Sequence, residues 1–326
     1  MTIVVTGAGG MVGSHMVEKL AAQGHRVIGT YYKPTINMNE IMDNRIEMVE
    51  CDVRYPQSVE RIIKEYKPDR VFHLAAQSYP AVSWERPYET MDININGTVS
   101  IFEAIKIVRD QQDGQYDPMV VVACSSAEYG ETLNELEGDN VYVKEAAMLK
   151  PLHPYGVSKV GQDLLSFQYF MNDHIRCIRA RIFNSTGTRK VNDVTSDFTK
   201  RAILSERDGS YKIKVGNLNT RRAIMDQRDL VSALLLLAEQ GTPGEVYNIS
   251  SENIYTMRDI IKLIEKDLNH SLELEVDERL FRPTDEKVIA GDVTKLKRDT
   301  NWKQCISMGQ TVTDMLSYWR KALSLD

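Results

Sequence analysis

The chain lacks the residue patterns that mark several classes of protein. Its 326 residues include only four cysteines, and no two of them are spaced as Cys-x-x-Cys. Thiols so far apart in sequence predict free cysteines, as expected of a cytoplasmic protein, rather than a disulfide framework. The six histidines are scattered, with no His-Glu-x-x-His or similar spacing. We therefore expect no metal site.

Excess positive charge and long apolar runs are missing as well. The formal net charge is −6, which offers no basic surface for a nucleic acid. No stretch approaches the roughly 20 apolar residues that a membrane-spanning helix needs. The chain opens on the β-branched run Thr2–Thr6, which is typical of a strand and not of a signal peptide. We expect a cytoplasmic protein that binds neither nucleic acid nor membrane.

The first half of the chain alternates short β-branched runs with longer helical patterns. Strands are predicted at Thr2–Thr6, Arg26–Thr30, Ile46–Glu50, Arg70–Leu74, Met119–Cys124 and Ile175–Arg181. Helices are predicted at Met11–Gln23, Gln57–Tyr66, Tyr88–Val108 and Pro154–Asn172. This alternation indicates an α/β fold in which crossover helices cover both faces of a doubly wound parallel sheet.

The alternation becomes irregular beyond residue 184, which predicts a smaller second lobe. A helix is expected at Leu230–Glu239, a strand at Glu245–Ile249, a helix at Met257–Leu268 and a strand at Leu272–Val276. We predict a dinucleotide-binding domain over residues 1–183, to which residues from about 216 to 250 return. Most of residues 184–326 would then form an interleaved substrate-binding lobe.

A glycine-rich turn follows the first predicted strand. Gly7, Gly10 and Gly13 are spaced as Gly-x-x-Gly-x-x-Gly, and Met11 and Val12 open the next helix. Glycine allows a tight turn and a close approach of the backbone to a pyrophosphate. The N-terminus of the helix adds unpaired N–H groups and a partial positive charge. In this position the motif predicts a Rossmann-type dinucleotide site.

The ends of the next two strands bear on which dinucleotide is bound. An NAD site usually has an acidic residue after its second strand, where it holds the ribose 2′-hydroxyl; the run Gly29–Lys33 contains none. Lys33 could instead meet a 2′-phosphate, which favours NADP with NAD as the alternative, or it could be a solvated loop lysine. Asp52, followed by Val53, could contact the adenine amine or cap a helix.

Tyr155 and Lys159 stand four residues apart in a predicted helix. Residues at this spacing project from the same face. A neighbouring ammonium favours the phenolate and should lower the pKa of the tyrosine. The pair therefore predicts a tyrosine that exchanges a proton during catalysis.

With these features the sequence resembles the extended short-chain dehydrogenase/reductase family over nearly its whole length. The further matching segments are His73-Leu74-Ala75-Ala76, Asn94-Ile95-Asn96-Gly97-Thr98 and Ser125-Ser126. Within the family it looks most like the GDP-sugar branch, which contains GDP-mannose 4,6-dehydratases and GDP-4-keto-6-deoxy-mannose reductases. That likeness lies in Ala75-Ala76-Gln77-Ser78, Phe183-Asn184, Gly216-Asn217-Leu218, Arg222, and Arg282-Pro283-Thr284-Asp285.

The resemblance implies a role for each of these residues. Tyr155 would be the acid/base, Lys159 would hold the nicotinamide ribose, and Ser125 would bind the sugar 4-oxygen. The other residues expected at the cofactor are Leu74, Ala75, Ala76 and Asn94. Those expected at the GDP-linked hexose are Gln77, Ser78, Ser126, Asn184, Asn217, Arg222 and Arg282. Arginine forks match diphosphate oxygens.

The loop after Ser125 bears on which reaction is catalysed. A 4,6-dehydratase needs a carboxylate to remove the C5 proton, and in dehydratases this glutamate is the second residue after the catalytic Ser or Thr. Alignment on Tyr129-Gly130 places Ala127 there, as in the Ser-Ala pattern of sugar-nucleotide 4-epimerases. A different register makes Glu128 the base.

The leading prediction is a GDP-sugar 4,6-dehydratase with Glu128 as base. The alternatives are a GDP-4-keto-6-deoxy-sugar reductase or a nucleotide-sugar 4-epimerase, neither of which needs that carboxylate. A rival from another class is a catalytically silent nucleotide-binding regulator. The family resemblance also implies a homodimer or homotetramer, formed through the helices Tyr88–Val108 and Pro154–Asn172.

Overall fold

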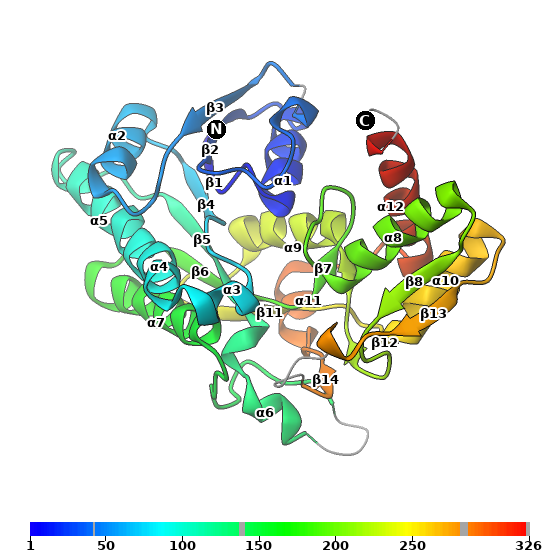
Figure 1. Ribbon diagram of the computed structural model, residues 1–326. Helices are drawn as coiled ribbons and strands as arrows, with labels where there is room; N and C mark the ends of the chain where they lie inside the picture. Colours follow the sequence, from blue (N-terminus) through cyan, green and yellow to red (C-terminus); the bar gives the residue numbers. More distant parts are fainter. Residues whose placement is uncertain (42, 137–140, 281–285, 324–326) are drawn as a thin grey trace.

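A seven-stranded sheet forms the centre of the molecule. The computed structural model describes residues 1–41, 43–136, 141–280 and 286–323 (Figure 1). The sheet strands are β1 (Thr2–Thr6), β2 (Arg26–Tyr31), β3 (Ile46–Glu50), β4 (Arg70–His73), β5 (Met119–Ser125), β6 (Cys177–Ile182) and β11 (Val246–Ile249). Their order is β11-β6-β5-β4-β1-β2-β3, and every neighbouring pair is parallel. The strand order reverses beside β1, and in such folds ligands bind at the carboxyl ends of the strands near that point.

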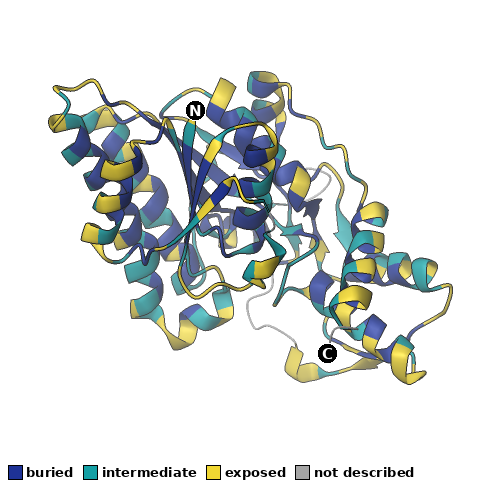
Figure 2. Ribbon diagram, turned by 90° about the horizontal axis from the view of Figure 1, so that it is seen from above, coloured by how far each residue is buried: buried dark blue, intermediate teal, exposed yellow. Residues whose placement is uncertain are grey.

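Helices cover both faces of this sheet, as the alternation predicted. One face packs against α1 (Met11–Ala22), α9 (Gln227–Gln240) and α11 (Thr294–Thr300), and the other against α2 (Pro56–Tyr66), α5 (Gly97–Asp110) and α7 (Pro154–Asp173). Ile3 and Val5 of β1 enter the first core, whereas Val4 enters the second. Alternate side chains of a strand point to opposite faces, so a strand covered on both sides is apolar throughout. Figure 2 shows the sheet buried between these layers.

The predicted strands are confirmed with small shifts at their ends. The sixth begins at Cys177 rather than at Ile175. The N–H of Ile175 donates to the carbonyl of Tyr169 in the preceding helix, so this residue belongs to the helix–strand turn.

The predicted helix Tyr88–Val108 is divided into three parts. It consists of α4 (Pro87–Met91), a π-helical turn over Asp92–Asn96, and α5. A π-turn adds a residue to the helical path, and such turns are frequent at functional sites. Here the turn contains the fully buried Asn94. Gly97 follows where a Cβ would lie 2.7 Å from Cγ2 of Val53, so only glycine lets the helix approach the loop after β3 this closely.

The second lobe has a hydrophobic core of its own. It contains α8 (Val194–Asp208), α10 (Met257–Leu268), α12 (Met308–Ala322) and the parallel pair β8 (Lys212–Val215) and β13 (Glu273–Val276). Figure 1 shows these elements gathered away from the main sheet. Smaller sheets pair β7 (Ser185–Thr186) with β10 (Met225–Asp226), and β9 (Arg221–Arg222) with β12 (Tyr255–Thr256) and β14 (Val288–Ile289). Among the helices that the structure describes, none is both long and apolar enough to cross a membrane.

Candidate active site

The glycine turn lies at the reversal point of the sheet, between β1 and α1. Gly7 has φ +74°, and a Cβ there would lie 2.8 Å from the backbone nitrogen of Ala75. A Cβ on Gly13 would lie 2.2 Å from the carbonyl oxygen of Gly7. Gly10 is the N-cap of α1, where no side chain caps the first N–H groups. A close turn that leads into an uncapped helix N-terminus fits a bound pyrophosphate.

Two cations lie beside Tyr32, just beyond β2. The Lys33 ammonium is 5.2 Å from the centre of the Tyr32 ring, and the Arg54 guanidinium is 5.7 Å from it. The Asp52 carboxylate accepts hydrogen bonds from the Arg54 guanidinium, the shortest of 2.6 Å. The N-cap position of helix α2 is occupied by Tyr55, without a side-chain capping bond, so the helix-capping alternative for Asp52 is wrong. The sequence analysis did not identify Arg54; its position two residues after Asp52 was the available signal.

Ser125, Tyr155 and Lys159 lie together at the end of β5. The Ser125 hydroxyl lies close enough to the Tyr155 hydroxyl to favour its ionised form. The Lys159 ammonium is 5.8 Å from the centre of the Tyr155 ring. It donates 2.7 Å hydrogen bonds to the carbonyl of Ala123 and to Oε1 of Gln162. Tyr155 lies in the first turn of α7, which Pro154 opens after the His153 cap.

Burial is the largest influence on the pKa values of Tyr155 and Lys159. It raises the pKa of Tyr155 to about 12, against the opposing effect of the Ser125 hydroxyl. It lowers the pKa of Lys159 to about 8. The expectation that Lys159 lowers the pKa of Tyr155 is therefore wrong for this arrangement, because the ammonium is directed at Ala123 and Gln162 while the phenol is fully buried. A phenol with so high a pKa is protonated at neutral pH and suits a proton donor.

Asn94 ties the loop after β4 to α7. Its Nδ2 donates to Oγ of Ser158 at 2.8 Å and to the carbonyl of Gln77 at 3.0 Å, and its Oδ1 accepts from the Gln77 N–H. The Gln77 amide in turn bonds within its own loop, to Tyr79 and Thr90. These bonds fix the backbone at Gln77, and the N–H groups of Leu74 and Ala75, beside the glycine turn, donate to Oγ1 of Thr6.

Glu128 is enclosed in the protein interior beside this site. Its side chain is fully buried at the end of η3 (Ser126–Glu128). Oε1 accepts from the backbone N–H of Ser125 at 2.7 Å, and Oε2 accepts from Nε of Arg181 at 3.0 Å. Burial and the nearby Asp163 carboxylate raise the pKa of Glu128. This position conflicts with the prediction that Glu128 removes a substrate proton.

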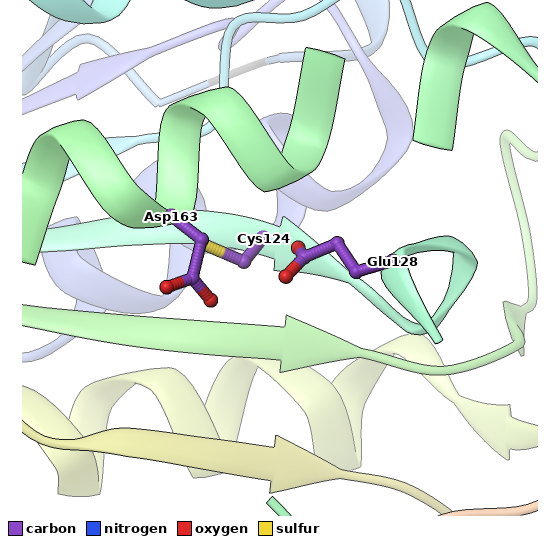
Figure 3. Close-up of side chains that lie close together, drawn as sticks. All are labelled: Cys124, Glu128 and Asp163. Atoms are coloured by element: carbon purple, nitrogen blue, oxygen red, sulfur yellow. The ribbon is translucent and has the colours of Figure 1, made fainter. Parts of the chain in front are cut away.

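Cys124, Glu128 and Asp163 offer atoms of metal-ligating type within 4.8 Å of one another (Figure 3). The carboxylates of Glu128 and Asp163 are already hydrogen-bonded to two guanidinium groups. Nε of Arg181 donates to both, and Arg179 donates to Asp163 at 2.7 Å. The arrangement is a buried ion-pair cluster, in which the charge that a metal ion would supply is already present.

The residues expected at the nucleotide sugar are spread over several elements. Asn184 follows β6, and its buried Oδ1 has no hydrogen-bond partner, which fits a ligand donor. The Arg222 guanidinium is largely buried in β9 and donates to the carbonyls of Arg221 and Glu286. The other predicted positions differ in exposure: Ser78 and Asn217 are exposed, and Ser126 is buried. Arg282 lies outside the described residues.

Comparison with known proteins identifies the family of the chain. The family model described as GDP-mannose 4,6 dehydratase matches residues 4–315. The chain is 27% identical to the GDP-6-deoxy-D-mannose reductase of Pseudomonas aeruginosa, over 97% of this chain and 96% of that protein. It is 24% identical to a GDP-mannose 4,6-dehydratase of Vibrio cholerae, over 96% and 92%. The structure of RMD from Pseudomonas aeruginosa complexed with NADPH superposes with a TM-score of 0.81, at 25% identity over 98% and 99%. The chain belongs to the GDP-mannose 4,6 dehydratase family, a family of NAD(P)-dependent enzymes that modify sugar nucleotides.

Proposed function

We propose that the chain is an NADPH-dependent reductase that converts the C4 ketone of a GDP-linked 4-keto-6-deoxyhexose to an alcohol. The observation that carries this proposal is the position of Glu128. Ser125, Tyr155 and Lys159 supply what a carbonyl reduction needs, whereas the Glu128 carboxylate is enclosed with Arg181 and Asp163. The remaining candidate position, Ala127, has no ionisable group.

The chain's own residues would bind the reactants and move one proton. NADPH, held at the glycine turn, would supply the hydride to C4. The protonated Tyr155 donates its proton to the 4-oxygen as negative charge develops there, and Ser125 orients that oxygen by a hydrogen bond. Lys159, whose ammonium is 5.8 Å from the centre of the Tyr155 ring, would hold the ribose. Lys33, with Arg54 beside it, favours the additional phosphate of NADPH over NADH.

The nucleotide is assigned to GDP on the resemblance of its binding segments and on the names of the relatives above. Asn184 and Arg222 would bind the diphosphate, and Asn217 would lie by the nucleoside. Gln77, Ser78 and Ser126 would line the hexose side. The unpartnered Oδ1 of Asn184 is an acceptor and would take a hydroxyl of the substrate, while its Nδ2 would donate to the diphosphate.

The alternative functions differ from the reductase in product mass and in their use of NADPH. A dehydratase would convert GDP-mannose to a product lighter by one water with no net use of NADPH. A 4-epimerase, favoured by the Ser-Ala pattern at Ala127, would leave both the mass and the cofactor unchanged. A silent regulator would transfer no hydride, and the complete Ser125, Tyr155 and Lys159 set argues against it.

The decisive assay supplies GDP-4-keto-6-deoxymannose with NADPH and follows both absorbance and product mass. Stoichiometric NADPH oxidation with a gain of two hydrogens supports the reductase. Water loss from GDP-mannose in the absence of added NADPH would instead establish the dehydratase. A change of retention time at constant mass and constant cofactor would establish the epimerase.

We also propose that the chain forms a homodimer through α7. Val157, Leu164 and Met171 recur at intervals of seven along this helix, and all three are exposed. Residues at this spacing lie on one face, and an exposed apolar stripe of this kind is typical of an interface.

A further inference from the structure

Arg181, at the end of β6, connects the two elements that carry the catalytic residues. Its guanidinium is almost fully buried. Nε donates to Oε2 of Glu128 at 3.0 Å and to Oδ2 of Asp163 at 2.9 Å. Nη1 donates to the hydroxyl of Tyr129 and to the carbonyl of Glu145, both at 3.0 Å. One side chain thus joins the loop after β5 to α7.

The two carboxylates that Arg181 binds belong to the elements that carry the catalytic residues: Glu128 to the turn that contains Ser125, and Asp163 to the helix that contains Tyr155 and Lys159. Glu128 accepts the backbone N–H of Ser125 at 2.7 Å, while Oγ of Ser125 accepts the N–H of Ala127 at 3.2 Å. These bonds form a capping box around the turn that contains Ser125. Asp163 lies one helical turn beyond Lys159 and two beyond Tyr155 on α7. Figure 3 shows Glu128 and Asp163 extending from these two elements toward one another.

We propose that Glu128 is a positioning residue that, through Arg181, holds the Ser125 hydroxyl beside the Tyr155 hydroxyl. The proposal rests on the proposed function, in which that pair binds the sugar 4-oxygen. A fully buried carboxylate is stable only when its oxygens are paired. Any displacement of the loop relative to α7 would lengthen at least one of the two charge-assisted hydrogen bonds that Nε of Arg181 donates.

The geometry explains why a carboxylate occupies this position. An apolar side chain at residue 128 would leave the Ser125 N–H buried without an acceptor. A glutamine would keep that acceptor but turn amide hydrogens toward Arg181, which is itself a donor. An apolar substitution therefore removes both the acceptor for the Ser125 N–H and the ion pair with Arg181, whereas glutamine removes only the ion pair. The two substitutions should lower kcat to different extents.

A double-mutant cycle with Ser125 tests the proposal. In the wild-type background, Glu128→Met should lower kcat by about tenfold or more with KM changed less than about twofold. Glu128→Gln should have a smaller effect in the same direction. In the Ser125→Ala background each substitution should change kcat by less than about twofold, because a residue that acts through Ser125 has nothing left to position. Equal losses in both backgrounds would overturn the proposal.

The matched control is Asp229→Asn, which converts another buried carboxylate that accepts backbone N–H groups, those of Cys305 and Ile306. It should lower the melting temperature and leave kcat within about twofold of wild type. A similar loss of kcat here would show that core damage alone explains the Glu128 variants. Both Glu128 substitutions are measured in the cycle. If the methionine variant does not fold, the glutamine variant alone tests the positioning role.

Crystal structures of wild type and Glu128→Gln separate this proposal from the proposed function. If the wild type reduces no 4-keto sugar, the reductase assignment fails, yet the distance from Ser125 Oγ to Tyr155 Oη can still be measured in both proteins. A longer separation in the variant supports the positioning role. An unchanged separation refutes it, whatever reaction the wild type catalyses.

Discussion

The buried ammonium of Lys159 should make the protein more stable as the pH rises above neutrality. Burial lowers the pKa of this group from 10.5 to about 8. The folded chain therefore binds the proton less tightly than the unfolded chain does. At neutral pH the amine is charged in both states, and the cost to folding is about 3 kcal/mol. Between about pH 8 and pH 10.5 the folded state is neutral while the unfolded state is still charged, so the cost declines.

The expected gain can be worked out from these two pKa values. Raising the pH from about 7 to about 9.5 should recover about 2 kcal/mol of that cost. Urea denaturation of the wild type and of Lys159→Met at both pH values measures it. Other titrating groups affect both proteins, so the wild type should gain about 2 kcal/mol relative to the variant. Equal pH dependence in the two proteins would refute the reasoning and show that the ammonium is solvated or fully compensated.

Three further predictions concern the catalytic acid, the cofactor and the assembly. Tyr155→Phe should lower kcat by about 10²–10⁴-fold and leave NADPH affinity unchanged, since the phenol donates a proton; a parallel loss of binding in a fluorescence titration would argue against this role. Lys33→Ala should weaken NADPH binding by about tenfold while sparing NADH, because only NADPH has a 2′-phosphate for the ammonium to meet; an equal effect on both cofactors would contradict the assignment. Leu164→Glu should convert a dimer to monomers in sedimentation velocity, since it places a charge in the exposed stripe of α7; a wild-type monomer would rule out the interface.

The sequence was sufficient for features that depend on local spacing. The Gly7, Gly10 and Gly13 turn and the Tyr155/Lys159 pair lie within single turns or adjacent elements. Their roles as a close turn and as neighbours on one helix face follow from backbone geometry alone. The strand pattern is equally local, because strands covered on both faces are apolar along their whole length.

The sequence was insufficient where a distant residue decides the outcome. Glu128 turns inward because Arg181, 53 residues later, supplies a buried partner, and nothing near Glu128 in the sequence signals that contact. The need for glycine at position 97 comes from close packing against Val53, which lies far away in the sequence. The pKa of Tyr155 follows its burial rather than its spacing from Lys159, and burial is a property of the assembled fold.

The most direct test of the central claim is the product balance with purified GDP-4-keto-6-deoxymannose and NADPH. The reductase assignment predicts one NADPH oxidised per sugar reduced, with GDP-mannose alone left unchanged. Conversion of GDP-mannose to a product lighter by one water, without consumption of NADPH, would contradict it. That result would require a carboxylate other than the buried Glu128 to act as base, or a loop that releases Glu128 from Arg181.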